Sequence, residues 1–509
     1  MRFYKKIFII FTALILLTDV CFPKAALSIS VKKEEEMGRE FMRVVLEHFK
    51  LIEDPFIVNY VNKIGNKIVS ALPPQPFNYR FYIIKENVYN AFASPAGNIF
   101  INSGLFEAME NEEELAGILA HEIAHVVCRH ISQRIERQSK IGFITLAGIA
   151  AGMLLGLEGK GTASSALTLG SVAAGQSISL AYSREDEIQA DQIGLKCLNK
   201  TGYSGSGLLT MLKKIRSKQW FGPEEIPTYL TTHPASEDRI VYIGSWLEDS
   251  EKPSGQVFNI DPYDFQITHA RFVSTHGEES LVLKKFETRI AECPSDPIAL
   301  YGYGLVLAKT GNLKDAAINL KKALEKRAFD SHILKDLGRI YFLDGRYEEA
   351  LKTLETSLNI APDDIECLFF LGRTQTGLGR YGNAENTFEK LIEKDPDYNQ
   401  ALYFLGDAYG KHGRLEDAHY YLGLYYKNEG NFKNAEFHLN KALKTDDPDK
   451  KLKIKEMLKE ISKKSSPKEG FKGSRFKGSR VTNNYIRSKW ENCIINVPRP
   501  WVADLNEVE

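Results

Sequence analysis

The chain has 509 residues, more than one ordinary domain contains, so two or three domains are expected. Hydrophobic residues make up 43% of the chain, which is the composition of a globular protein and not of a disordered one. The 66 Lys and Arg residues balance the 66 Asp and Glu residues, so overall charge gives no argument for a nucleic-acid partner.

Residues 1–28 have the features of a signal peptide. Basic residues precede an uninterrupted apolar run, Ile7–Leu17, which is short for a bilayer span, and small residues suited to cleavage follow at Ala25 and Ser28. Lipidation at Cys21 and an uncleaved anchor are the alternatives, although Val20 stands where lipidation requires a small residue. We therefore expect export to an oxidising compartment. The cysteines show no CxxC spacing, so a disulfide framework is not indicated, and a single bridge stays open.

Residues 29–250 are expected to form one domain of helices with a small sheet. Helical periodicity covers residues 33–49 and 56–72, and Pro73-Pro74 ends the second of these helices. Short strands are predicted at Phe81–Ile84 and at Asn98–Asn102. Three glutamates at 112–114 then begin a further helix, where negative charge suits the helix dipole.

That helix carries the sequence HEIAHVVCRH. His121 and His125 lie one turn apart on one face, so both imidazoles can reach the same metal ion, and Glu122 can reach a water at that ion. This HExxH arrangement predicts a zinc site, which needs a third protein ligand and an open position for water. The alternative is a helix with two core histidines and a surface glutamate.

The third ligand is sought further along the chain. The pattern HExxHxxGxxH would require Gly and His where the chain has Cys128 and Ile131, and His130 is off register, so we expect His130 beside a ligand or at the surface. The segment Tyr182–Gly194 offers Glu185, Glu187 and Asp191 instead. Glu187 and Asp191 share a helix face, so Glu187 as ligand with Asp191 supporting a ligand histidine is consistent. An ordinary charged helix is the alternative.

Residues 141–157 form an uncharged apolar segment with glycines at four-residue spacing. Three interpretations stay open: a buried helix, a hairpin that contacts the membrane or covers the site, and a transmembrane span. The third would make the chain an integral membrane protease.

Residues 285–460 repeat with a period of 34. Alanines mark the second half of each unit and a glycine stands twelve positions before each alanine; these are Ala316, Ala350, Ala384 and Ala418, and Gly304, Gly338, Gly372 and Gly406. This is the tetratricopeptide period, which predicts an all-α solenoid with a concave binding face. A further alanine, Ala435, follows after 17 residues, so one helix is expected to serve two half-units. Residues 251–284 are a linker, and residues 461–509 a basic tail that we expect to be disordered and solvated.

Several motifs together resemble the HtpX/BepA-type zinc metallopeptidases, which are gluzincins. They are HEIAH, YSREDEIQAD at 182–191, HPASEDR at 233–239, and NAFASPAGNIFINSGL at 90–105, in which Ala96 replaces a usual glycine. With the signal segment and the repeats, the chain is most similar to the periplasmic BepA-type branch over residues 30–445. The resemblance implies an α+β gluzincin domain, mostly helical with a small sheet, followed by the solenoid.

The resemblance also implies a role for each site residue. His121, His125 and Glu187 hold one Zn²⁺ per chain, Glu122 is the general base, and Asp191 and Arg239 brace the site. His233 lies near the metal, where it caps the fourth position in a resting state or assists the oxyanion. The predicted edge strand pairs with an extended substrate through Asn98, Ile99, Phe100, Ile101 and Asn102.

The function expected on this basis is periplasmic hydrolysis of peptide bonds in unfolded or misassembled envelope proteins. The repeats would dock the client or a partner, with the outer-membrane protein assembly machinery as the partner that the resemblance implies. Peripheral membrane contact is compatible with these features, and no nucleic-acid partner is expected. The alternative is a chaperone or scaffold of envelope protein assembly whose protease site is latent and capped.

Overall fold

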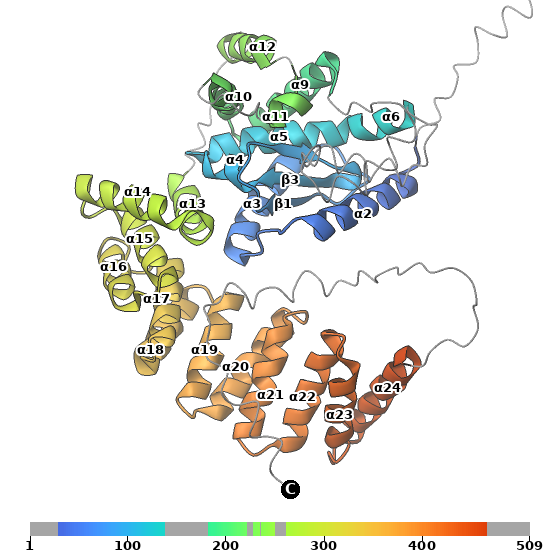
Figure 1. The fold of residues 1–509 in the computed structure, drawn as a ribbon, viewed down its shortest axis with the longest axis vertical. Coiled ribbons are helices and arrows are strands. Elements are labelled where there is room, and N and C mark those ends of the chain that lie inside the picture. Colours follow the sequence, from blue (N-terminus) through green and yellow to red (C-terminus); the bar gives the residue numbers. More distant parts are fainter. Residues whose placement is uncertain (1–28, 138–181, 221–227, 235, 250–260, 466–509) are drawn as a thin grey trace, which may run out of the picture. The chain divides into compact units, whose positions relative to one another are not determined.

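The computed structural model describes residues 29–137, 182–220, 228–234, 236–249 and 261–465. The chain divides into two compact units between Thr268 and His269 (Figure 1). The predicted signal segment and the apolar segment 141–157 lie outside the described residues. Among the helices that are described, none is both long enough and apolar enough to cross a membrane.

The first unit is mostly helical, as predicted. The helices expected at 33–49, at 56–72 and from residue 112 correspond to α2, α3 and α5. The described helices of this unit are α2 (Val31–His48), α3 (Pro55–Val69), α4 (Ser103–Glu107), α5 (Glu112–Val127), α6 (His130–Arg137), α9 (Arg184–Thr201), α10 (Ser206–Trp220), α11 (Thr228–Thr232) and α12 (Ser236–Asp249). Helix α13 (Pro262–His276) crosses from this unit into the second.

The small sheet has the strand order β1-β3-β2, with β1 at Arg80–Ile84, β2 at Ala91–Ala93 and β3 at Asn98–Asn102. Strand β3 pairs in parallel with β1 and antiparallel with β2. The prediction that Asn98–Asn102 is an edge strand was therefore wrong, because both of its sides are occupied. A short turn, η1 (Pro95–Gly97), folds the chain back so that β2 covers the side that was expected to be open. Among the described strands, β2 forms that edge.

The turn between β2 and β3 has an unusual backbone. Ala96 has a φ of 65° and Gly97 a φ of 87°, both in the left-handed region. That region suits glycine and strains a residue with a Cβ, so the alanine at 96 adopts a conformation for which glycine is the usual choice. Gly38 of α2 packs against this turn so closely that a Cβ there would lie 2.6 Å from the carbonyl oxygen of Pro95.

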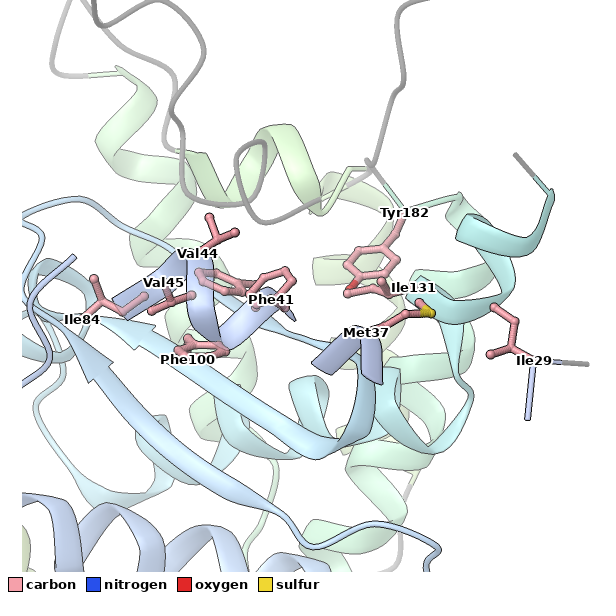
Figure 2. Close-up of a cluster of buried hydrophobic side chains, with 10 residues drawn as sticks. Ile29, Met37, Phe41, Val44, Val45, Ile84, Phe100, Ile131 and Tyr182 are labelled. Atoms are coloured by element: carbon pink, nitrogen blue, oxygen red, sulfur yellow. The ribbon is translucent and has the colours of Figure 1, made fainter. Parts of the chain in front are cut away.

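A hydrophobic core lies between α2 and the sheet (Figure 2). The apolar stripe of α2 supplies Phe41, Val44 and Val45, which pack with Phe100 of β3 and Ile84 of β1. The same cluster extends to Ile131 of α6 and to Tyr182, which are labelled in Figure 2. Burying each such side chain stabilises the fold by about 1.5–3 kcal/mol, so α2 is anchored firmly over the sheet.

The second unit is an all-α array of stacked helix pairs, as the 34-residue period predicted (Figure 1). Its helices are α14 (Glu279–Glu292), α15 (Pro297–Lys309), α16 (Leu313–Lys326), α17 (Ser331–Leu343), α18 (Tyr347–Ile360), α19 (Ile365–Gly377), α20 (Tyr381–Lys394), α21 (Asn399–Lys411), α22 (Leu415–Asn428), α23 (Phe432–Ala442) and α24 (Pro448–Ser465). Helix α22 packs against both α21 and α23, so it is the shared helix. The described part of the predicted linker is largely helical, since it contains α13 and the start of α14.

The four described cysteines, Cys128, Cys197, Cys293 and Cys367, are free thiols. None of them forms a bridge with another described residue, so the single disulfide that the sequence left open is not found among them.

Candidate metal centre

Helix α5 is fixed at its N-terminus by capping and by two buried hydroxyl groups. The side chain of Asn111 accepts a hydrogen bond from the amide of Glu114, which caps the first turn. Glu112 is buried and accepts hydrogen bonds from the hydroxyls of Tyr60 (2.6 Å) and Tyr203 (2.7 Å), which come from α3 and from the chain just after α9. These contacts set the position of the helix that carries His121 and His125.

Helix α9 is capped and packs closely on α5. Ser183 and Asp186 form a reciprocal capping box at its start. Gly194 allows close approach, because a Cβ at this position would lie 3.1 Å from the carbonyl oxygen of Ala120. Glu187 of α9 therefore lies within reach of the imidazoles of α5.

The structure brings His121, His125, Glu187 and His233 together. One potential ligand atom from each lies within 4.8 Å of the others, and all four side chains are buried. The Nε2 atoms of His121 and His125 are 3.0 Å apart, and the Glu187 carboxylate oxygens lie 3.4 Å and 3.5 Å from them. Tetrahedral zinc with ligands at 2.0–2.1 Å separates them by roughly 3.3 Å, so this triangle has the size that zinc requires.

Buried polar atoms without a regular hydrogen bond also mark this point as a ligand site. The carboxylate oxygens of Glu187 and Nε2 of His233 are buried and make no hydrogen bond of normal geometry, although one oxygen of Glu187 is ion-paired with Arg239. Buried polar atoms rarely lack partners, since leaving one unsatisfied costs about 1–3 kcal/mol. Two imidazole nitrogens and a carboxylate are a donor set that zinc prefers, so the residues fit such an ion.

Asp191 and Arg239 are charged residues that contact the ligand cluster directly. Asp191 lies 2.9 Å from Nδ1 of His121, and Arg239 donates two hydrogen bonds of 2.8 Å to the Asp191 carboxylate. Nη1 of Arg239 also approaches an oxygen of Glu187 at 2.5 Å. Burial alone would raise the pKa of Glu187, but Arg239 and His233 hold it well below its usual range. Glu187 is therefore an anion, ready to bind a cation.

The pKa values of the two α5 histidines are shifted in opposite directions. Burial lowers the pKa of His125 to about 3, so this imidazole is neutral and can bind a metal. Burial and Arg239 also act to lower the pKa of His121, but Asp191 and Glu187 outweigh them and raise it to about 9. A metal ion bound at His121 would therefore displace a proton.

Glu122 lies beside the cluster. Its carboxylate makes no hydrogen bond of normal geometry with a described residue. Both of its oxygens are buried, and one lies 3.5 Å from Nε2 of His233. Burial raises the pKa of Glu122 to about 7, although His121 and the nearby backbone amide of Ala93 act in the opposite direction. A carboxyl group with a pKa near neutrality can both accept and return a proton.

His233 follows α11 and is held between aromatic rings. Its ring stacks on Tyr229 at a centroid distance of 4.2 Å, and Tyr182 lies 5.0 Å away. Its Nδ1 is 2.9 Å from the hydroxyl of Thr232. These contacts leave Nε2 directed at the cluster.

Two residues near the cluster, Tyr182 and Tyr229, had no assigned role in the sequence-based site, and the position of His130 was left open. Tyr182 stacks on His125 at 3.8 Å, and Tyr229 packs on His233. The YSREDEIQAD motif begins at Tyr182 and could have indicated it, whereas no sequence pattern points to Tyr229. Nδ1 of His130 lies 2.8 Å from Nδ1 of His125, and its Nε2 lies 3.0 Å from the side-chain oxygen of Gln189. His130 therefore lies beside a ligand, one of the two positions that the sequence left open.

Strand β3 does not offer a free edge beside the metal-ligand cluster, because it is the central strand of the sheet. Strand β2 lies next to the proposed general base, since the amide of Ala93 is near the Glu122 carboxylate. Within the described residues, β2 has a partner strand on one side only.

Comparison with known proteins agrees with this arrangement. Residues 59–247 match the model of peptidase family M48, and tetratricopeptide repeat models match residues 282–331, 329–397, 371–431 and 416–449. The chain is 30% identical over 326 residues to the beta-barrel assembly-enhancing protease of Yersinia pestis, covering 63% of each protein. It is 31% identical over 216 residues to the protein of that name from Escherichia coli K12, covering 42% of this chain and 44% of the relative. The chain thus spans less than two thirds of either relative.

Among solved structures, MamA matches with a TM-score of 0.29 and 21% identity, covering 34% of this chain and 95% of MamA. The family match implies a metal ion at the cluster of histidines and Glu187. This chain carries a domain of peptidase family M48, followed by tetratricopeptide repeats.

Proposed function

We propose that the chain is a zinc-dependent endopeptidase of the periplasm that hydrolyses peptide bonds of unfolded or misassembled envelope proteins. His121, His125 and Glu187 would hold one zinc ion per chain. The observation that carries this proposal is the buried ligand triangle, whose edges of 3.0–3.5 Å suit zinc. The match to peptidase family M48 over residues 59–247 supports it.

Glu122 is the residue proposed to move the proton. When bound, a zinc ion supplies Lewis acidity, which polarises a peptide carbonyl and makes water more acidic. The Glu122 carboxylate would take the proton of the attacking water as the new C–O bond forms, and would deliver it to the departing nitrogen, after which the C–N bond breaks. Burial of Glu122 excludes competing proton donors and keeps its pKa close to neutrality.

Strand β2 is proposed to bind the substrate in place of β3. Its backbone is adjacent to Glu122 through Ala93, and one of its edges has no partner among the described strands. All three residues of β2 are buried, so an extended peptide would add to that edge through backbone hydrogen bonds once the edge is uncovered. This mode favours unfolded segments, because a folded client does not present a free extended backbone.

The tetratricopeptide repeats are proposed to dock clients or partners. Arrays of this type present a concave surface for polypeptide binding. The outer-membrane protein assembly machinery is the partner that we propose, because the relatives are named as proteases that enhance beta-barrel assembly.

A chaperone or scaffold with a latent protease site is the second candidate. One observation favours it: Nε2 of His233 is unpaired, buried and directed at the ligand cluster, where it could cap the fourth zinc position. The His233→Ala substitution tests capping. Higher casein hydrolysis by the variant would support a capped resting site, and unchanged hydrolysis would exclude capping by His233.

The central test uses two substitutions with one matched control. Glu122→Gln should abolish casein hydrolysis while zinc content stays at one per chain, because Glu122 is not a proposed ligand. Glu187→Ala should lower zinc content, whereas Glu185→Ala on the exposed side of α9 should leave it unchanged. If Glu187→Ala retained one zinc per chain, Glu187 would not be the third ligand. Full activity of Glu122→Gln or of chelator-treated wild type would refute the proposed zinc-dependent hydrolysis.

A further inference from the structure

Buried cations in the second unit have carboxylate partners supplied by the chain. Arg271 donates a hydrogen bond of 2.7 Å to Asp336 and also contacts Glu366 at 3.1 Å. Lys335 lies 2.9 Å from Glu366 and 3.2 Å from Asp364. Such pairing is expected, because a charge removed from water without a partner destabilises the fold.

Arg373 of α19 does not follow this rule. Its guanidinium lies over three aromatic rings, with its central carbon 4.6 Å from the ring centroids of Phe342 and Phe404 and 5.5 Å from that of Phe369. The side chain is half-buried and makes no ion pair or hydrogen bond with a described residue. Burial lowers the pKa of Arg373 to about 10, so the group remains a cation at neutral pH.

The preceding repeat provides an internal comparison. Arg339 occupies the same position 34 residues earlier, and it contacts Asp336 at 3.0 Å, three positions before it. In the repeat of Arg373, the position equivalent to Asp336 is Phe370. The carboxylate is thus replaced by a ring, while the arginine is kept. The array therefore holds a cation here that Asp407 attracts but that has no ion-pair partner among the described residues.

We propose that Arg373, with Phe342, Phe369 and Phe404, binds an Asp or Glu side chain within an extended apolar segment of a partner polypeptide. The carboxylate pairs with the guanidinium, whose planar fork suits two parallel hydrogen bonds. Apolar side chains beside the acid contact the rings, of which Phe342 and Phe404 are partly exposed. We name the four residues the Arg373 site.

The position of the Arg373 site favours an internal acidic residue over a chain terminus. Its rings come from α17, α19 and α21, which are neighbours in the array, so Arg373 lies between two other helices of the same face. A segment that crosses the site therefore continues over a helix on either side. The inference concerns the repeats alone and holds whether or not the metal centre hydrolyses peptides.

The test measures peptide binding to the full chain carrying Glu122→Gln, which removes the proposed base and so protects the probe. The probe is a short fluorescent peptide with both ends blocked and a single Glu among Leu, Val and Ser residues. A second peptide replaces the Glu by Gln. A hydrogen-bonded charge pair is worth about 1.5–3 kcal/mol, so the Glu peptide should bind at least roughly tenfold more tightly.

Substitutions then assign that preference to one residue. Arg373→Met should reduce the preference to about one, whereas Arg339→Met, at the matched position with its own carboxylate, should retain it. The melting temperature of Arg373→Met should change little, because loss of the contacts between the guanidinium and the rings is offset by removal of a partly buried charge, and an apolar side chain is kept. If that variant nevertheless unfolds, Arg373→Lys should bind the Glu peptide more weakly than wild type while still preferring it over the Gln peptide.

Three results would overturn the proposal. The Glu and Gln peptides could bind the unsubstituted site equally well. Arg373→Met could fold normally and keep the preference. A Gln peptide with a free terminal carboxylate could bind as tightly as the blocked Glu peptide, which would assign the site to chain ends.

Discussion

The contact between α5 and α10 gives a prediction whose size follows from the structure. A Cβ added at Gly207, in the first turn of α10, would lie 2.0 Å from the carbonyl oxygen of Glu113 in α5. Atoms of this kind are essentially never closer than 3.0 Å, so Gly207→Ala forces the helices apart by about 1 Å. Because the obstacle is backbone, no side chain can rotate away. Overpacking of this kind costs about 1–3 kcal/mol, and the upper end applies here.

Thermal unfolding and zinc affinity together measure this effect. A loss of about 3 kcal/mol should lower the melting temperature by roughly 6–12 °C in a unit of this size. Zinc affinity, measured by competition with a chelator, should fall as well, because α5 carries His121 and His125. Gly244→Ala in α12 is the matched control, since nothing lies within 4 Å of a Cβ there. It should be neutral or stabilising by up to about 1 kcal/mol. Equal melting temperatures for Gly207→Ala and wild type would refute the reasoning, as would an equal fall in Gly244→Ala.

Three further predictions concern buried charge and histidine contacts. Arg239→Met leaves the Glu187 and Asp191 carboxylates without their cation, so the free energy of unfolding in chelator should fall by about 3–5 kcal/mol. The exposed Arg184→Met should change it little, and a loss below about 1 kcal/mol for Arg239→Met would contradict the assignment. His130→Phe should weaken zinc binding by about tenfold or more, because His125 loses its hydrogen-bond partner. His130→Asn keeps an acceptor and should recover part of that affinity, so equal affinities for the two variants would exclude an orienting role. Burial and the neighbouring His419 lower the pKa of His438 to about 4, so folding favours its neutral form. The stability it contributes is complete above pH 6.5 and is lost as the pH falls toward 4. His438→Gln should therefore flatten the pH dependence of the melting temperature in this interval, and an unchanged profile would show that His438 does not cause it.

Long-range regularities made much of the fold predictable. The 34-residue spacing of alanines and glycines indicated the helix pairs, because each small residue marks a close approach between helices. Gly304 shows this directly, since a Cβ there would lie 2.1 Å from the side chain of Leu320. The spacing of His121 and His125 likewise predicted two imidazoles on one helix face, which is a local property of helical geometry.

The sheet edge was harder to predict, because it depends on pairing between segments and not on local pattern. Strand β2 has only three residues and no alternation of polar and apolar side chains, so it gave no strand signal. Its pairing with β3 depends on the left-handed turn at Ala96 and Gly97. Alanine is uncommon in that conformation, so the sequence did not indicate the turn. His130 was ambiguous for a related reason. Its contact with His125 requires the chain to leave α5 and restart as α6, with Arg129 at a φ of 56° between them.

The hydrogen bonds of Glu112 have a consequence for the order in which the molecule can act. Glu112 links α5 to Tyr60, 52 positions earlier, and to Tyr203, 91 positions later. The helix with the paired imidazoles thus reaches its final place only when both distant segments have arrived, and the second of them brings α9 with its carboxylate ligand candidate. Under the proposed function, a nascent or half-assembled copy should accordingly be inert, and newly made molecules would not digest one another.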